Sequence, residues 1–370
     1  MRALKTPRSV EILLTNICNL RCAYCSHFSS ASDVGNDLPA HEWLSFFEEL
    51  NRAAVIDVTL EGGEVFCRPD LHELLEGVVR NRLRFTILTN GTLITEDIAG
   101  FIAGTRRCNT VQVSIDGSVA DTHDAARGKG NFLRTMKGID ILRRYNIPLS
   151  VRVTINRYNV GDLAHIAKLL LEDLGLPSFS TNAASYQGLC RANSGEVQLS
   201  VQERSFAMKE LLRLNTRYGG RINAAAGPLS EAVAWLEMVR FRREGKQEIP
   251  NRGRLVSCGG VFVKCGVRPD GVIVPCVQMS HIELGSINRD DFVRLWQEHP
   301  QLQRLRERRS IPLSEFVFCR GCDFIAYCAG SCPALAYTIV GDEFHPSPDA
   351  CLKRFLEAGG ELPYEQLLAA

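Results

Sequence analysis

The sequence lacks an excess of charge of either sign. Its 43 Lys and Arg residues nearly balance its 42 Asp and Glu residues, which gives a net charge of +1. A balanced chain has no overall attraction to a polyanion, so its composition indicates neither a nucleic acid nor an acidic membrane as a partner.

Long apolar runs are also absent. No uninterrupted apolar segment is long enough to span a bilayer, and residues 1–19 pass from a short basic segment into a strand-like one, without the apolar core and cleavage site of a signal peptide. Neither a fixed-period repeat nor a low-complexity tract is present. The chain has 370 residues, 45% of them hydrophobic, enough to bury the core of one large or two medium domains. We therefore expect a globular, cytoplasmic protein.

Cysteine is abundant, with 14 residues. A reducing cytosol disfavours structural disulfides, so this number points to metal sites. Three cysteines lie close together near the amino terminus, and eight lie between residues 258 and 351. The two groups indicate two metal regions. The three isolated cysteines, Cys67, Cys108 and Cys190, are interpreted as small buried apolar residues.

Residues 9–183 alternate short apolar runs with amphipathic stretches, the pattern of repeated strand–helix units around a parallel sheet. We expect strands at residues 10–15, 55–61, 84–89, 110–115, 149–155 and 178–181. We expect helices at residues 41–52, 71–81, 96–102, 132–145 and 162–173. Polar segments at residues 61–64, 89–91 and 114–117 follow strands directly, where parallel α/β folds gather their active sites.

Composition changes twice along the chain and predicts three regions. Residues 1–199 contain the strand–helix units, residues 200–250 read as a charged helical connector, and residues 251–370 are rich in Gly, Pro and Cys. A Cys-rich region with few periodic segments is expected where metal sites replace part of a hydrophobic core.

The amino-terminal cysteines Cys18, Cys22 and Cys25 have the spacing C-x-x-x-C-x-x-C. Three thiolates on one loop can bind three irons of a cubane cluster and leave the fourth iron open. An open iron can chelate the amino and carboxylate groups of S-adenosylmethionine. Spacing alone also permits a Cys3His zinc site that includes His27.

The segment N-I-C-N-L-R-C-A-Y-C resembles the radical S-adenosylmethionine superfamily. Gly62-Gly63-Glu64 after the second strand and Ser114-Ile115-Asp116-Gly117 after the fourth resemble that family's motifs in the same order, although Val65 stands where proline is usual. The resemblance implies an α/β fold with a partial (β/α)6 TIM-like barrel. It also implies cofactor contacts by Tyr24 at the adenine, by Gly62, Gly63 and Glu64 at the methionyl amino group, by Ser114 and Asp116 at the ribose, and by Asn90 and Arg127.

A second array, Cys319-x2-Cys322-x5-Cys328-x3-Cys332, is followed by Cys351. Upstream, a hairpin turn expected at Asp270-Gly271 lies among three further cysteines. Spacing permits zinc ribbons or iron–sulfur clusters. The array resembles the SPASM extension, which implies two auxiliary 4Fe-4S clusters and three clusters in total. One auxiliary set would be Cys258, Cys265, Cys276 and Cys332, and the other Cys319, Cys322, Cys328 and Cys351.

Eight ligands for two clusters favour electron transfer, and hence an oxidative reaction. Family analogy suggests that the enzyme modifies a ribosomally made precursor peptide by a thioether or carbon–carbon crosslink, with a flavodoxin or ferredoxin type electron donor. The first strand begins near residue 10, which leaves no room before it for a leader-recognition domain. We therefore expect a separate leader-binding partner.

Three alternatives remain open. A sulfatase-maturase-like reaction is weakened because Val277, not aspartate, follows Cys276. The others are dehydrogenation of a protein side chain or a small alcohol, and a zinc-bearing peptide-binding scaffold without turnover. Asp270, His281 and Glu283 are candidate proton acceptors, none of which the sequence selects, and residues 185–187 are expected at the substrate entrance.

Overall fold

The computed structural model describes residues 3–28, 37–247, 249–256 and 258–364. Six parallel strands lie side by side in chain order: β1 (Ser9–Thr15), β2 (Asp57–Gly62), β3 (Arg84–Thr89), β4 (Cys108–Ser114), β5 (Leu149–Ile155) and β6 (Phe179–Ala183). The predicted α/β fold with a parallel sheet is confirmed.

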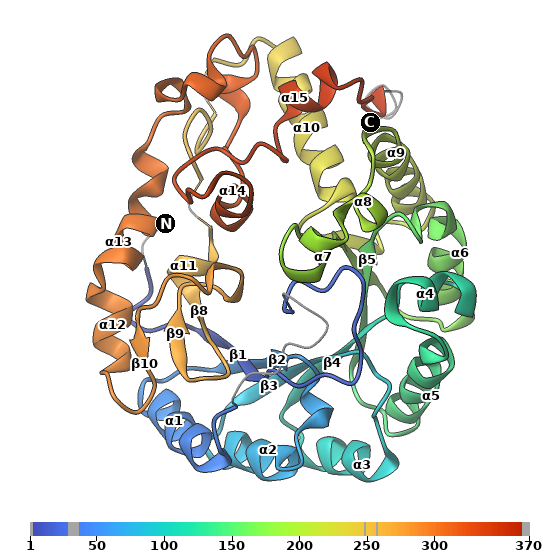
Figure 1. The fold of residues 1–370 in the computed structure, drawn as a ribbon, viewed down its shortest axis with the longest axis vertical. Coiled ribbons are helices and arrows are strands. Elements are labelled where there is room, and N and C mark those ends of the chain that lie inside the picture. Colours follow the sequence, from blue (N-terminus) through green and yellow to red (C-terminus); the bar gives the residue numbers. More distant parts are fainter. Residues whose placement is uncertain (1–2, 29–36, 248, 257, 365–370) are drawn as a thin grey trace.

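The helices between these strands cover the outer face of the sheet, with the strands inside (Figure 1). They are α1 (Ala40–Arg52), α2 (Leu71–Arg80), α3 (Glu96–Thr105), α4 (Ala120–Arg127), α5 (Asn131–Arg144) and α6 (Leu163–Lys168), which continues as a π-helical turn over Leu169–Asp173. Trp43, Phe46 and Phe47 of α1 are fully buried in the core they form with the strands. Each such side chain contributes about 1.5–3 kcal/mol. The inner face is left for polar side chains.

The sheet extends beyond the six predicted strands. Within the described residues its order is β10-β9-β8-β1-β2-β3-β4-β5-β6-β7. Strand β7 (Ile222–Ala224) comes from the segment expected to be a helical connector, between α9 (Val201–Arg217) and α10 (Pro228–Arg243). Three residues are too few for an alternating pattern to be recognised.

The Cys-rich region joins the same sheet at its other edge. Strand β8 (Lys264–Val267) pairs in parallel with β1 and forms an antiparallel hairpin with β9 (Val272–Val274), which pairs with β10 (Gly285–Ser286). The hairpin predicted at Asp270-Gly271 is confirmed. Gly271 has a φ of +83°, a conformation that glycine adopts without strain. One sheet thus runs through all three predicted regions.

The carboxy-terminal segment closes the molecule into a ring (Figure 1). Phe355 on α15 packs on Trp235 of α10 with ring centroids 4.9 Å apart. The remaining helices are α7 (Gly188–Ala192), α8 (Ser194–Val197), α11 (Gly260–Val263), α12 (Phe292–Glu298), α13 (Pro300–Glu307), α14 (Pro333–Val340) and α15 (Leu352–Glu357). Short 3-10 turns lie at Val65–Cys67, Val160–Asp162, Val277–Met279, Arg308–Ser310, Leu313–Glu315, Val317–Cys319 and Ile325–Tyr327. Among the described helices, none has the length and apolar character needed to cross a membrane.

Candidate active site

The three amino-terminal cysteines lie on the loop that follows β1, and all three line one cavity of about 270 Å³. We call it the triad cavity. The end of β2 holds this loop, because Gly63 N donates to Thr15 O at 2.8 Å and Glu64 N donates to Ile17 O at 2.8 Å. A Cβ on Gly62 would lie 2.5 Å from Thr15 O, and one on Gly63 would lie 2.2 Å from Ile17 O. The two glycines are therefore required for backbone packing against the cysteine loop.

Helix α7 holds the other end of the same loop. Leu189 N donates to Phe28 O at 2.6 Å, and Cys190 N donates to Cys25 O at 3.2 Å. Gly188 has a φ of +52°, and a Cβ there would lie 2.4 Å from Phe28 O. Gly188 was not among the predicted site residues, although a glycine shortly after the last predicted strand was a usable signal.

Glu64 connects the ends of β2 and β3. Its carboxylate accepts hydrogen bonds from Thr89 Oγ1 at 2.7 Å, Asn90 N at 2.7 Å and Phe66 N at 3.2 Å. Glu64 is 1% exposed, and this burial raises its pKa above the usual value. Asn90 borders the cavity, and its Nδ2 donates to Asn19 Oδ1 on the cysteine loop at 2.9 Å. Glu64 thus supports the cavity wall from behind.

Asp116 supports the opposite wall. It is fully buried and accepts hydrogen bonds from the Tyr24 hydroxyl, from Arg127 Nε at 2.5 Å and from Thr154 N at 2.8 Å. Burial raises the pKa of Tyr24 well above its usual value, so its hydroxyl remains a donor. Tyr24 and Arg127 border the cavity while Asp116 does not. Asp116 therefore orients the two side chains that border the cavity.

Six of the eight predicted cofactor residues line the triad cavity, namely Tyr24, Gly62, Gly63, Asn90, Ser114 and Arg127. Their roles toward the cofactor stay predictions. Asn182, which was not predicted, also borders this cavity, and its buried Oδ1 has no hydrogen-bond partner in the described part of the chain. A buried unpaired acceptor suits a ligand that brings a donor. Three thiols and this acceptor around one cavity fit an iron–sulfur cluster with S-adenosylmethionine beside it.

The thiols are not arranged around a single ion. Among the described residues, no three His, Cys, Asp or Glu side chains converge closely enough to hold one metal ion. Burial raises the pKa of the Cys18 thiol to about 12 and that of Cys22 to about 11. Cluster assembly would therefore displace protons from these thiols. The Cys3His zinc alternative with His27 gains no support from this geometry.

The structure brings one predicted auxiliary set together completely. Four thiols, those of Cys319, Cys322, Cys328 and Cys351, line a single small cavity. In the other set, Cys276 and Cys332 each lie near Cys258. Burial raises the pKa of both thiols, the charge of Glu11 raises that of Cys276 further, and the nearby Cys258 raises both.

Cys265, predicted as the fourth member of that set, lies elsewhere. It is 1% exposed in the hydrophobic core, and its charged neighbours are Glu11 and Arg306. Strand β8 places it opposite the buried Val10 of β1, on the face covered by helices. The structure therefore groups three of these four thiols.

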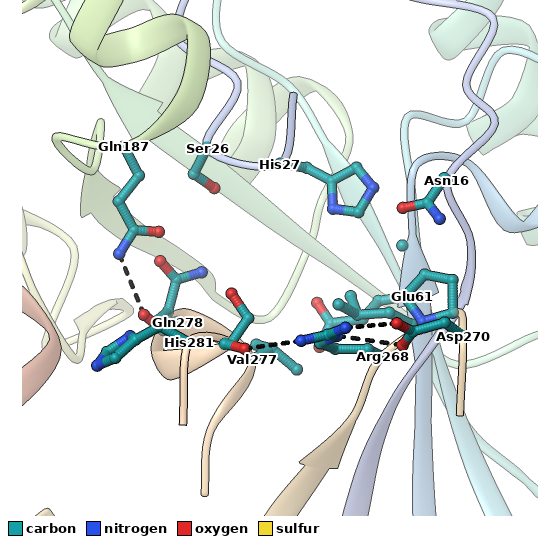
Figure 2. A pocket seen from close by; sticks show the side chains of 14 residues that line it. Asn16, Ser26, His27, Glu61, Gln187, Arg268, Asp270, Val277, Gln278 and His281 are labelled. Atoms are coloured by element: carbon teal, nitrogen blue, oxygen red, sulfur yellow. Dashed lines mark hydrogen bonds and ion pairs between the residues drawn. The ribbon is translucent and has the colours of Figure 1, made fainter. Parts of the chain in front are cut away.

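A larger cavity of about 760 Å³ adjoins the triad cavity, and we call it the outer cavity. It lies between the barrel and the β8–β9 hairpin and is lined by mostly polar side chains (Figure 2), among them Asn16, Ser26, His27, Glu61, Gln187, Arg268, Asp270, Gln278, Ser280 and His281. Four residues border both cavities: Ser26, His27, Glu61 and Gly62. The two cavities therefore meet along this boundary.

The predicted proton acceptors differ in their surroundings. Arg268 is paired with Asp270 (Figure 2), and its Nη1 also lies 2.8 Å from the Glu283 carboxylate. Burial acts to raise the Asp270 pKa, but the hydrogen bond and charge of Arg268 outweigh it and hold that pKa below its usual value. His281 stacks on Tyr337 with ring centroids 3.4 Å apart, and burial lowers its pKa.

Residues 185–187, expected at the substrate entrance, are divided between the cavities. Ser185 borders the triad cavity and Gln187 borders the outer one. Gln187 Nε2 donates to Gln278 O at 3.2 Å, which joins the barrel to the Cys-rich region across the outer cavity.

Comparison with known proteins now decides the family. Residues 12–170 match the Radical SAM superfamily, and residues 258–323 match the SPASM iron-sulfur cluster-binding domain. The chain belongs to the radical SAM superfamily and its SPASM subfamily. It is an enzyme of that superfamily, with S-adenosylmethionine and iron–sulfur clusters as cofactors.

Its relatives act on different substrates. The AdoMet-dependent heme synthase of Methanosarcina barkeri is 28% identical over 92% of this chain and 95% of its own length. The antilisterial bacteriocin subtilosin biosynthesis protein AlbA of Bacillus subtilis is 25% identical over 88% of this chain and 67% of its own. The crystal structure of Streptococcus suis SuiB bound to the precursor peptide SuiA has a TM-score of 0.70 at 16% identity, and covers 95% of this chain and 77% of SuiB. At that identity it shows the fold alone.

Proposed function

We propose that this enzyme oxidises a ribosomally made precursor peptide and installs a thioether or carbon–carbon crosslink. The observation that carries the proposal is the outer cavity, which meets the triad cavity along four shared residues. Its side chains include the amides of Asn16, Gln187 and Gln278, which can both donate to and accept from a peptide backbone. When bound and reduced, S-adenosylmethionine supplies a radical that removes hydrogen from an unactivated carbon.

The residues of the triad cavity then have distinct roles. Cys18, Cys22 and Cys25 hold the cluster, while Tyr24 and Arg127, oriented by Asp116, bind the cofactor. Arg127 is a natural partner for a carboxylate, because its guanidinium retains further donors beyond Nε. Asn90 and Ser114 offer polar contacts on the remaining wall.

We further propose two auxiliary 4Fe-4S clusters, which bring the total to three. The set that includes Cys351 is already gathered around one cavity. In the other, Cys258, Cys276 and Cys332 are gathered as three ligands, whereas Cys265 lies in the hydrophobic core away from them. A flavodoxin or ferredoxin type protein as electron donor and a separate leader-binding protein complete the proposal, and cytoplasmic localisation suits these partners and oxygen-sensitive clusters.

AlbA, a bacteriocin biosynthesis protein, supports a peptide substrate. The heme synthase supports a second candidate, oxidation of a tetrapyrrole, because it matches this chain over almost its whole length. Tetrapyrrole precursors carry several carboxylates, so a site that binds one needs several cationic side chains that are not already paired. In the outer cavity, Arg268 is engaged by Asp270 and Glu283, and this arrangement favours the peptide.

The test is a comparison of substrates. Anaerobically reconstituted enzyme is given S-adenosylmethionine, a reductant and either a peptide encoded beside its gene or a carboxylated tetrapyrrole, and both are analysed by mass spectrometry. Loss of two hydrogens from the peptide, absent with Cys18→Ala and retained with Cys108→Ala, supports the proposal. An unchanged peptide beside an oxidised tetrapyrrole would overturn it.

A further inference from the structure

Glu61 occupies an unusual position on β2. Strand alternation turns Val58 and Leu60 into the helix-covered core and leaves Asp57, Thr59 and Glu61 on the inner face. Glu61 is the last of these before the glycines that hold the cysteine loop. It borders both the triad cavity and the outer cavity (Figure 2). Among the described residues, it is the only carboxylate that borders both.

The Glu61 carboxylate has no direct hydrogen bond or ion pair with any residue of the described ranges. Three charged groups act on it from other strands of the sheet: Glu11 on the adjacent strand β1, Arg152 on β5 and Lys264 on β8. Lys264 is paired with Glu11, and Arg152 Nε donates to Ser180 Oγ at 3.3 Å. The nearest cations therefore already have other partners.

This environment favours the protonated carboxyl. Burial, and then the nearby charge of Glu11, raise the pKa of Glu61 to about 8, although Lys264 and Arg152 act in the opposite direction. A group that changes protonation state near neutral pH can both take up and release a proton during turnover.

We propose that Glu61 is the proton acceptor for the substrate bound in the outer cavity. The proposal rests on the oxidative function proposed above. The bound cofactor would supply the radical that takes one hydrogen atom from the substrate carbon, and an oxidised auxiliary iron–sulfur cluster would accept the remaining electron. The atom that becomes bonded to this carbon gives its proton to Glu61. The substrate thereby loses two hydrogens and gains one bond.

The other acidic and basic groups of the outer cavity are placed less well. Asp270 is held by Arg268, and His281 lies on the outer cavity alone, stacked on Tyr337. His27 borders both cavities but lies on the cysteine loop, two residues after Cys25. It is the rival to be tested beside Glu61.

The experiment compares Glu61→Gln, Glu61→Asp and His27→Gln in the reconstituted enzyme. The measured quantity is oxidised product formed per 5'-deoxyadenosine, from pH 6 to 9.5, on whichever substrate the wild type oxidises. The matched control is Asp57→Asn, on the same strand and face but outside both cavities; Asp57 accepts a hydrogen bond from Asn109 Nδ2 at 2.8 Å.

Glu61→Gln is expected to lower this ratio about 100-fold and to remove the rise with pH that the wild type shows toward pH 8. Glu61→Asp should restore part of the ratio, and Asp57→Asn should keep the wild-type value. In cluster-free protein, infrared spectroscopy should show a carboxylic acid band that disappears near pH 8 and is absent from Glu61→Gln.

A wild-type ratio and pH profile in Glu61→Gln would overturn the proposal, as would loss of the pH dependence in His27→Gln alone. Oxidation of a tetrapyrrole in place of a peptide would overturn the proposed function. The ratio measured on that tetrapyrrole would still decide the role of Glu61.

Discussion

Replacing Asp116 with asparagine removes a fully buried negative charge and keeps the side-chain shape. Asparagine can still accept from Thr154 N, but its amide turns a donor toward Arg127 Nε and the Tyr24 hydroxyl, which are donors themselves. Arg127 is 7% exposed, so its charge is left buried without a partner. Breaking a buried ion pair from one side costs about 3–5 kcal/mol.

The expected change in melting temperature follows from chain length. At about 2.1 cal/mol/K per residue over 370 residues, a loss of 3–5 kcal/mol lowers the melting temperature by about 4–6 °C. The assay is thermal unfolding of wild type and Asp116→Asn at equal iron content, because bound clusters stabilise the folded state. Glu96→Gln is the control, since Glu96 and Arg144 are each at least half exposed and their pair contributes at most about 1 kcal/mol.

The double variant Asp116→Asn with Arg127→Met checks the cause. Removing both charges should recover part of the lost stability, because the unpaired buried cation is then gone. A melting temperature of Asp116→Asn within 1 °C of wild type would refute the reasoning, and so would a double variant that is less stable than the single one.

Three further predictions concern other parts of the site. In chemical unfolding, Glu61→Gln should be as stable as wild type near pH 5 and more stable at pH 8–9, by at most about 5 kcal/mol. The reason is that the Glu61 pKa is raised from 4.5 to about 8, so that the stability of the wild type falls as the pH rises between these values. A stability advantage of Glu61→Gln that shrinks as the pH rises would contradict this. Gly188→Ala should displace the cysteine loop and lower the iron content by about four irons per chain. Gly195→Ala is the control, because a Cβ there meets open space, and its iron content should equal that of the wild type. Equal iron content in the two variants would show that α7 does not hold the loop. Cys351→Ala should lose about four irons by elemental analysis and Cys108→Ala none, so that full iron content in Cys351→Ala would remove this residue from the cluster set.

The strands could be predicted because their buried faces repeat at every second residue. Helix α4 was not predicted, since its sequence ADTHDAAR carries little apolar periodicity and its position is fixed by Arg127 and His123 packing inward. Strand β7 depends on pairing with β6, and three residues hold too little information on their own.

The cofactor motifs could be found because their residue types and order are visible in the chain. The sequence could not show which of these side chains border the cavity and which lie behind its wall, because packing between distant strands decides this. Glu64 and Asp116 were expected at the ligand and lie behind the residues that border the cavity. Cys265 was grouped with distant cysteines by analogy, whereas the parallel pairing of β8 with β1 turns it into the core.

Glu61 could have been recognised from alternation, because it shares the inner face with Asp57 and Thr59. What the sequence could not supply is its position between two cavities, one of which is completed by a hairpin some 200 residues later in the chain.

The central claim is that Cys18, Cys22 and Cys25 hold the cluster that cleaves S-adenosylmethionine. The most direct measurement is iron content and 5'-deoxyadenosine formation in anaerobically reconstituted wild type and in the variant with all three cysteines changed to alanine. We expect about twelve irons and 5'-deoxyadenosine formation for the wild type, and about eight irons and no 5'-deoxyadenosine for the variant. Zinc in place of iron, or cofactor cleavage that persists in the variant, would contradict it.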